Sequence, residues 1–354
     1  MRRIFSIAML IVGTVIGAGF CSGREIVSFF GSGVSIVVAP VCGVSIFFVC
    51  MLFLSIGSRI GEKSFDKINS VLLGKYHFAA DIFLLVNNLI VLSAMIAGLN
   101  SLLKPFVPFP VFGAAAAVLC AVIASKGVSG MLDCNFIVVP VIIAVLAAVC
   151  FASFGTEVMD ASLGMFRMRI FPIAAMYVSM NMMLASTVLT TLGKLTRKQI
   201  VLSSAIAAAS ITALLALIIT ALNCTGNYSA EMPILEISAG AGKWLYVLLA
   251  AVTGISIFTT MLTAVGGLVG YLGGKAGGKV FNSAVVVIAG TVTSFLGFTR
   301  VVSLFYPLVG VVGLIYIVMC IKFVCKAAKP RKKIFGKGVQ SVDKSSTGGG
   351  ILNT

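Results

Sequence analysis

Long apolar runs separated by short polar segments make up most of this 354-residue sequence. A helix rises 1.5 Å per residue, so about 20 apolar residues cross a hydrocarbon layer of roughly 30 Å. Only 10% of the residues are charged, whereas a soluble domain carries about 25%. So few charges cannot cover a water-facing surface of this size, and we therefore predict an all-α integral membrane protein.

The apolar runs predict about ten transmembrane helices within a single domain, residues 1–325. The segment 58–77 is amphipathic and predicts a loop with a short surface helix, and 155–168 is a second candidate of this kind. Residues 326–354 are basic and then rich in serine and glycine, which predicts a disordered tail. The predicted spans are 4–30, 33–57, 78–101, 108–125, 132–154, 169–192, 199–222, 243–271, 279–298 and 301–325.

The basic residues set the predicted orientation. With ten spans and a cytoplasmic N-terminus, 20 of the 26 lysines and arginines fall on the cytoplasmic side, as the positive-inside rule requires. We therefore predict a multi-pass protein of the cytoplasmic membrane with both termini in the cytoplasm. The net charge of +16 then indicates contact with anionic membrane lipid, not with nucleic acid.

Signatures of enzymes and metal centres are absent from the sequence. It contains no GxSxG elbow, no P-loop and no HExxH motif. The nine cysteines and one histidine show no metal-ligand spacing, and most cysteines lie in apolar runs, where they pack as small apolar residues. We therefore predict that the protein is not an enzyme and that it holds no metal centre.

Ten spans divide into two sets of five, about 4–154 and about 169–325. Because five is odd, the second set must run upside down relative to the first, and such inverted repeats are typical of secondary transporters. No repeat is visible in the sequence itself, so this prediction depends on the topology alone.

The most informative segment is residues 13–25, GTVIGAGFCSGRE, inside the first predicted span. Its four glycines are Gly13, Gly17, Gly19 and Gly23. Glycine costs about 1 kcal/mol relative to alanine in a helix interior, so this cluster predicts a break in the helix. Unpaired peptide groups at membrane depth persist only where they line a cavity or bind a solute. The two half-helix ends would then hold a cation and a carboxylate.

Close helix packing is the alternative interpretation of these glycines, since Gly13 and Gly17 have GxxxG spacing. The polar residues Ser22 to Glu25 favour the break, because a packing helix has no use for them. Arg24 and Glu25 would act in ion coupling or gating. Alternatively they lie at the outer interface, because residue 25 is about 31 Å from Ile4 along a continuous helix.

A matching break is expected in the sixth span, at the start of the second repeat. This span carries Tyr177, Ser179 and Asn181 near its middle but has no glycine there. The three polar groups would contact a solute, and hydrogen bonding between helices is an equally good explanation. Asn87 and Asn88 of the third span must face protein or a water-filled path.

The eighth span presents the hydroxyls of Ser256, Thr259 and Thr260 on one face. Hydroxyls together with unwound carbonyls make a site for a hard cation. Hydrogen bonds from these hydroxyls to their own helix are the alternative. Asp81 lies near a helix start, where the helix dipole explains it without a function.

The first-span motif, residues 13–26, resembles that of the YkvI-like membrane proteins, distant relatives of the amino acid–polyamine–organocation permeases. The likeness extends to Tyr177-Val178-Ser179 and Asn181, to the loop Glu231-Met232-Pro233, and to most of residues 1–325. It implies the leucine-transporter fold, in which two inverted five-helix repeats bind the solute beside broken first and sixth helices.

The resemblance also implies a sodium site. Carbonyls near Gly13 and Ile16 and the hydroxyls of Thr259 or Thr260 would match the ligands of that site. Proton-coupled relatives lack it, so the implied coupling ion is sodium or a proton.

These observations predict a secondary transporter, a permease or symporter for amino acids or similar small zwitterions, working by alternating access around a midplane site. One alternative is a ligand sensor on a permease fold, such as a germinant-receptor membrane subunit. Another is an assembly protein in which the glycines only pack. The predicted solute-binding residues are Gly17, Ala18, Gly19, Phe20, Ser22, Gly23, Tyr177, Ser179 and Asn181. The predicted ion-coupling or gate residues are Gly13, Ile16, Arg24, Glu25, Thr259 and Thr260.

Overall fold

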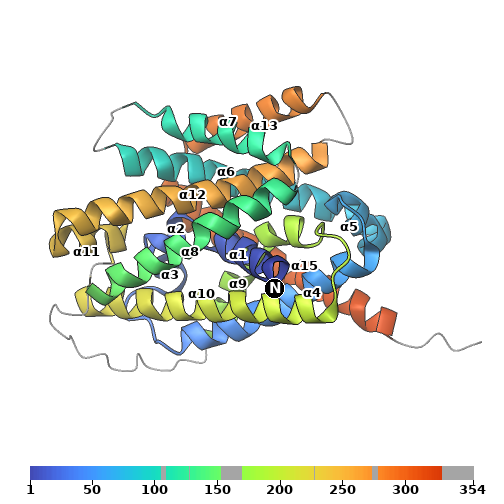
Figure 1. Ribbon diagram of the computed structural model, residues 1–354, viewed down its shortest axis with the longest axis horizontal. Helices are drawn as coiled ribbons and strands as arrows, with labels where there is room; N and C mark the ends of the chain where they lie inside the picture. The colour runs from blue at the N-terminus through green and yellow to red at the C-terminus, as the bar shows by residue number, and fades with distance from the viewer. Residues whose placement is uncertain (105–108, 127, 153–169, 227, 273–277, 329–354) are drawn as a thin grey trace, which may run out of the picture.

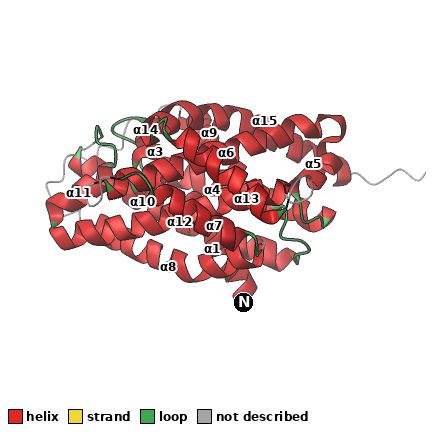
Figure 2. Cartoon of the chain, turned by 90° about the horizontal axis from the view of Figure 1, so that it is seen from above, coloured by secondary structure: helices red, strands yellow, loops and turns green. Residues whose placement is uncertain are grey.

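The computed structural model describes residues 1–104, 109–126, 128–152, 170–226, 228–272 and 278–328. Within these ranges the regular elements are helices, and no strand occurs among them (Figure 2). The long helices lie roughly along one axis, with the short helix α5 at one end of the bundle and α11 at the other (Figure 1). We call these two ends the α5 end and the α11 end.

The helices follow the predicted spans closely. Between α5 and α6 lies a 3-10 turn, Gly74–Tyr76, and between α14 and α15 a π-helical segment, Val301–Phe305. The α-helices are α1 Arg2–Val15, α2 Ala18–Cys21, α3 Arg24–Phe30, α4 Val38–Ile60, α5 Phe65–Leu73, α6 His77–Leu103, α7 Phe112–Ala124, α8 Val128–Ala152, α9 Ile170–Leu189, α10 Arg197–Thr225, α11 Pro233–Ala241, α12 Lys243–Leu272, α13 Lys279–Ser294, α14 Phe298–Arg300 and α15 Tyr306–Ala328.

Seven stretches of the described chain are long and apolar enough to cross a membrane, by length and composition. Two shorter apolar helices, Phe112–Ala124 and Phe281–Ser294, accompany them. The first predicted span is divided among α1, α2 and α3. The all-helical membrane character is therefore confirmed, whereas the count of ten spans and the inverted repeats stay predictions.

The first span is broken at two points, as its glycines predict. The helix α1 ends at Val15, and Gly17 is extended, with φ −103° and ψ −167°, before α2 begins. A second interruption at Ser22 and Gly23 precedes α3, and Gly23 has φ +77°, a left-handed conformation that glycine adopts without strain. The prediction of a broken first helix is therefore confirmed.

The expected matching break is not found in α9. This helix is continuous from Ile170 to Leu189, and the side-chain amide of Asn181 donates to the carbonyl oxygen of Tyr177 one turn earlier, at 3.0 Å. Alanine, methionine and leucine, which favour helices, fill this stretch, and it contains no glycine. The prediction of a second break was therefore wrong for the part of the sixth span that the structure describes.

Further segments differ from the predicted spans or lie outside the described residues. The part of the chain between the predicted spans 199–222 and 243–271 contains the short helix α11. The last helix continues to Ala328, so the tail begins later than residue 326. The segment 155–168 and residues 329–354 lie outside the described residues.

A buried polar network holds the predicted surface helix α5 against the bundle. The carboxylate of Asp81 on α6 accepts a 2.7 Å hydrogen bond from Asn69 on α5 and lies 3.3 Å from the ring nitrogen Nδ1 of His77. The hydroxyl of Tyr316 on α15 donates to Asn69 at 2.8 Å. Asp81 is therefore hydrogen-bonded within the protein, and helix-dipole stabilisation is not its whole explanation.

Candidate functional site

The first break exposes two carbonyl groups to α12. The amide of Gly17 donates to Val15, at 3.0 Å, so it does not pair with Gly13 one turn earlier as a continuous helix would require. The hydroxyls of Thr259 and Thr260 instead donate to the Gly13 oxygen, each at 3.2 Å. Thr260 also reaches the oxygen of Ile16, at 3.3 Å.

These contacts gather four neutral oxygen atoms from two helices in the buried interior. All the residues involved are buried. Gly17 allows the close approach, because a Cβ atom there would lie 3.0 Å from the Thr260 hydroxyl. Hard cations prefer oxygen ligands, and hydroxyl and carbonyl oxygens suit a monovalent ion without adding net charge. The residues present therefore fit a sodium ion, and the structure brings together the four that the resemblance implied.

Other hydroxyls of α12 bond partly within their own helix, as the alternative interpretation holds. Ser256 donates to Thr253 at 2.9 Å, and Thr259 also reaches Ser256, at 3.0 Å. Thr263 lies 3.2 Å from the hydroxyl of Thr14 on α1, one helical turn from Thr259. The contact between α1 and α12 thus extends one turn beyond the candidate cation site.

Glu25 is buried against the interrupted first span. Its side chain is 3% exposed, and its Oε2 atom has no hydrogen-bond partner. The carboxyl group folds back over Gly19, where a Cβ atom would come within 2.6 Å of the Glu25 carboxyl carbon. Its neighbour Arg24 points elsewhere and donates to the carbonyl oxygen of Ala230 at 3.2 Å. The side chain of Glu25 therefore lies inside the protein and does not extend outward from it.

Only part of the polar set on α9 faces this region. The ring of Tyr177 packs edge-on against Phe29 and Phe30 of α3, with centroid distances of 5.4 and 5.5 Å. Its hydroxyl is buried and has no hydrogen-bond partner. Ser179 instead lies against Gly313 of α15. The structure thus brings Tyr177 against the first span, whereas Asn181 bonds to its own helix and Ser179 faces another helix.

The α11 end of the break is covered by the segment that leads into α11. The amide of Ile234 donates to the carbonyl oxygen of Ser22 at 3.0 Å. Glu231 accepts hydrogen bonds from Ser101 and Thr299, both at 3.4 Å. Sequence reasoning missed this cover, although proline in Met232-Pro233 is a recognised signal for a helix start.

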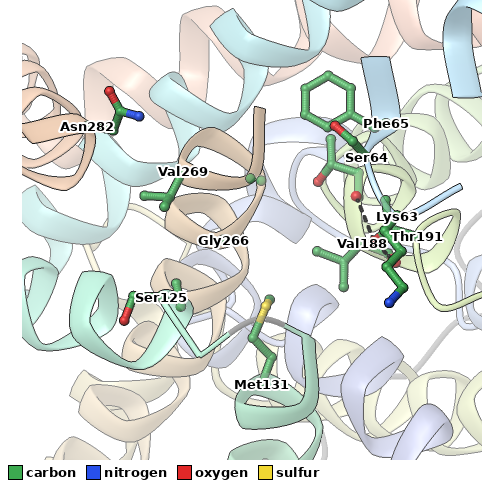
Figure 3. A pocket seen from close by; sticks show the side chains of 14 residues that line it. Lys63, Ser64, Phe65, Ser125, Met131, Val188, Thr191, Gly266, Val269 and Asn282 are labelled. Atoms are coloured by element: carbon green, nitrogen blue, oxygen red, sulfur yellow. Dashed lines mark hydrogen bonds between the residues drawn. The ribbon is translucent and has the colours of Figure 1, made fainter. Parts of the chain in front are cut away.

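The described residues enclose a cavity at the α5 end, opposite the covered end of the break. A cavity of about 230 Å³ lies between the segment entering α5, the ends of α7 and α9, and the helices α8, α12 and α13 (Figure 3). Thr187 of α9 and Thr191, just beyond the end of that helix, line it together with Gly266 and Gly267 of α12. Asn88 borders the same region, since a Cβ atom on Gly267 would lie 2.7 Å from its side-chain oxygen. The interior is therefore closed toward α11 and hollowed toward α5.

No family model matches the chain. The chain is similar to two uncharacterized proteins of Bacillus subtilis. It is 25% identical to YyaD over 329 residues, covering 88% of this chain and 94% of that protein. It is 26% identical to the membrane protein YkvI over 347 residues, covering 93% and 97%. The resemblance to YkvI-like proteins is thereby confirmed.

Solved transporters show a similar fold. MhsT in complex with L-phenylalanine matches with a TM-score of 0.67 at 14% identity, over 93% of this chain and 90% of that one. The nucleobase-cation-symport-1 transporter Mhp1, closed with bromovinylhydantoin bound, matches with a TM-score of 0.62 at 14% identity, over 86% and 74%. Its inward-facing form matches with 0.58 at 15% identity, over 89% and 75%. The chain is a membrane protein whose fold is similar to that of these transporters.

Proposed function

We propose that this protein is a cation-coupled secondary transporter for amino acids or similar small zwitterionic solutes. The observation that carries the proposal is the meeting of the Gly13 and Ile16 carbonyls with the hydroxyls of Thr259 and Thr260. Main-chain groups interrupted at membrane depth need a partner, and here they meet oxygen atoms that suit a cation. The buried Glu25, which lies against Gly19 of the same interrupted span, supports the proposal.

The architecture we propose for this function has ten spans in two inverted repeats, with the α5 end in the cytoplasm of the cell and the termini on that side. The basic loops support this orientation. In it, the cover formed by the α11 segment would close the outer face, and the cavity beside Thr187 and Gly267 would open toward the cytoplasm.

The solute would bind between the broken first span and α9. Gly17 to Gly23 would offer main-chain groups, and Tyr177 and Asn181 would offer side chains. The ligand bound to one structural neighbour, L-phenylalanine in MhsT, is consistent with a solute of this size. Sodium would bind at Gly13, Ile16, Thr259 and Thr260, and its binding would stabilise the contact between α1 and α12.

Uptake into proteoliposomes tests the proposal. The purified full-length protein is reconstituted, and accumulation of a panel of radiolabelled amino acids is followed with an inward sodium gradient, with an inward proton gradient, and with neither. We expect accumulation of at least one amino acid that requires the sodium gradient, and none in protein-free vesicles. Accumulation driven by the proton gradient alone would support the transporter function and show that the coupling ion is a proton, not sodium.

A ligand sensor on the same fold is the second candidate, because an interior closed toward α11 can hold a ligand without releasing it. Thermal stabilisation of the purified protein by an amino acid, with no flux in any gradient, would favour the sensor. If the panel gives neither flux nor stabilisation, both functions are contradicted.

A further inference from the structure

A single carboxylate lies in the interior next to the interrupted part of the first span. Glu25 is 3% exposed, and within the described residues no lysine, arginine or histidine nitrogen forms an ion pair with it. Arg24, the nearest basic residue in sequence, is directed to the carbonyl oxygen of Ala230. An isolated buried carboxylate is costly and in a membrane protein commonly marks a functional site.

Two buried tyrosines lie within electrostatic reach of this carboxyl group. They are Tyr177 of α9 and Tyr306 at the start of α15. The Tyr177 ring in turn packs on Phe29 and Phe30. Tyr306 is 2% exposed. A carboxylate among aromatic faces is the combination that recognises an organic ammonium group, because the ring quadrupoles attract the cation while the carboxylate neutralises it.

Gly19 gives the carboxylate its position. The side chain of Glu25 turns back toward the preceding helix α2 and occupies the space that a side chain at residue 19 would fill. The charge therefore lies against the interrupted backbone between α1 and α3, the segment that we propose contacts the solute. A carboxylate at the start of α3 that served only to contact water would point away from the interior of the protein.

We propose that Glu25 is the recognition group for the ammonium nitrogen of the transported solute, with Tyr177 and Tyr306 forming the walls around it. The proposal rests on the transporter function argued above and names the chemical class of the solute, a small molecule with a cationic amine. The coupling ion does not need this carboxylate, because four neutral oxygens of Gly13, Ile16, Thr259 and Thr260 already suit sodium.

Matched ligand sets separate the amine from the carboxylate of an amino acid. The first set is L-leucine, isopentylamine and 4-methylpentanoate. The second is L-phenylalanine, phenethylamine and 3-phenylpropanoate, and the third is L-alanine, ethylamine and propionate. Thermal stabilisation of the purified full-length protein is titrated with each compound in sodium buffer. We expect the amino acid and the amine of at least one set to stabilise the wild type, and the corresponding acid to give no shift.

The isosteric variant Glu25→Gln tests whether Glu25 binds the ammonium group. We expect its affinity for the responding amine to fall by about a hundredfold, since losing one partner of a buried charge pair costs several kcal/mol. Glu25→Asp keeps the charge and should recover part of the affinity. Glu62→Gln, which changes a carboxylate in the loop before α5, is the matched control and should bind as the wild type does.

The outcomes separate this inference from the function on which it rests. If Glu25→Gln binds the amine within about threefold of wild type, or if the acids stabilise the wild type as well as the amines do, the inference is overturned. Sodium-driven uptake that continues in Glu25→Gln with an unchanged KM would overturn the inference about Glu25 but would leave the proposed transporter function supported. Absence of both uptake and stabilisation in the wild type would overturn both. The comparison of amines with acids uses the wild type alone, so it tests recognition of the ammonium group even if Glu25→Gln does not fold.

Discussion

The hydroxyl of Thr260 on α12 donates to the main-chain oxygen of Ile16, at 3.3 Å, where the first span leaves its helical path. The two residues are 244 positions apart in the chain. This contact joins α12 to a carbonyl group at the end of α1. In the proposed function, a sodium ion would bind between the same two oxygen atoms.

The variant Thr260→Val should weaken both the structure and its response to sodium. Valine keeps the shape of threonine but leaves the carbonyl oxygens of Gly13 and Ile16 without this donor, at a cost of roughly 1–3 kcal/mol. We expect a lower melting temperature and at least about a tenfold higher sodium concentration for half-maximal thermal stabilisation. Thr291→Val is the control, because the Thr291 hydroxyl donates only to Val287 of its own helix, at 2.8 Å. Equal sodium titrations for wild type and Thr260→Val would contradict the cation site.

Gly19 and Glu25 should behave as a coupled pair. A methyl group at residue 19 collides with the carboxyl group of Glu25, so Gly19→Ala should displace that group and lower the melting temperature. In the background Glu25→Ala the same change should cost much less. A double-mutant cycle on melting temperatures measures the coupling, which we expect to be about 1–3 kcal/mol. Additive effects would show that Gly19 does not position the carboxylate.

The cover at the α11 end should loosen when Arg24 is removed. Arg24→Ala deletes the 3.2 Å hydrogen bond from the guanidinium to Ala230, a charge-assisted bond worth about 1.5–3 kcal/mol. Cys21, which is fully buried in the break, should then react about tenfold faster with a maleimide, as quantified by mass spectrometry. Arg59→Ala at the opposite end is the control. No change in the labelling of Cys21 would show that this bond does not hold the cover.

Two glycines in long helices should respond to alanine in opposite directions. A Cβ atom on Gly310 of α15 would lie 2.6 Å from the main-chain oxygen of Met176 on α9, whereas one on Gly270 of α12 would meet nothing within 4 Å. Gly310→Ala should therefore destabilise the protein by about 1–3 kcal/mol, because the backbone of α9 has to shift. Gly270→Ala should stabilise it by about 0.5–1 kcal/mol. Thermal unfolding of both variants in one detergent gives the comparison, and a stable Gly310→Ala protein would mean that α9 and α15 pack less closely.

The break in the first span could be predicted because local rules govern it. Glycine clusters disfavour a helix wherever they occur, so residues 13–23 indicate the interruption without knowledge of neighbouring helices. The partners of the freed carbonyls, Thr259 and Thr260, lie more than 240 positions away. They were named from the family resemblance, with the hydroxyls on one face of the eighth span as the supporting signal.

The position of Glu25 could not be predicted in the same way. A rise of 1.5 Å per residue places it near the outer surface only if the helix is continuous. The two interruptions, one with Gly23 at φ +77°, remove that assumption and turn the side chain inward. The cover from α11 was missed for a related reason, because the hydrogen bond from Ile234 to Ser22 depends on the tertiary arrangement.

Because α9 is continuous, the two sides of the candidate site should tolerate substitutions differently. On the first-span side, the proposed recognition would use peptide groups whose exposure requires particular glycines, so nearly every substitution there should disturb the fold. On the α9 side the peptide groups are satisfied within the helix, and only side chains such as Tyr177 reach the interior. Changes in solute preference among descendants of this protein should therefore accumulate on α9, while the first span stays nearly invariant.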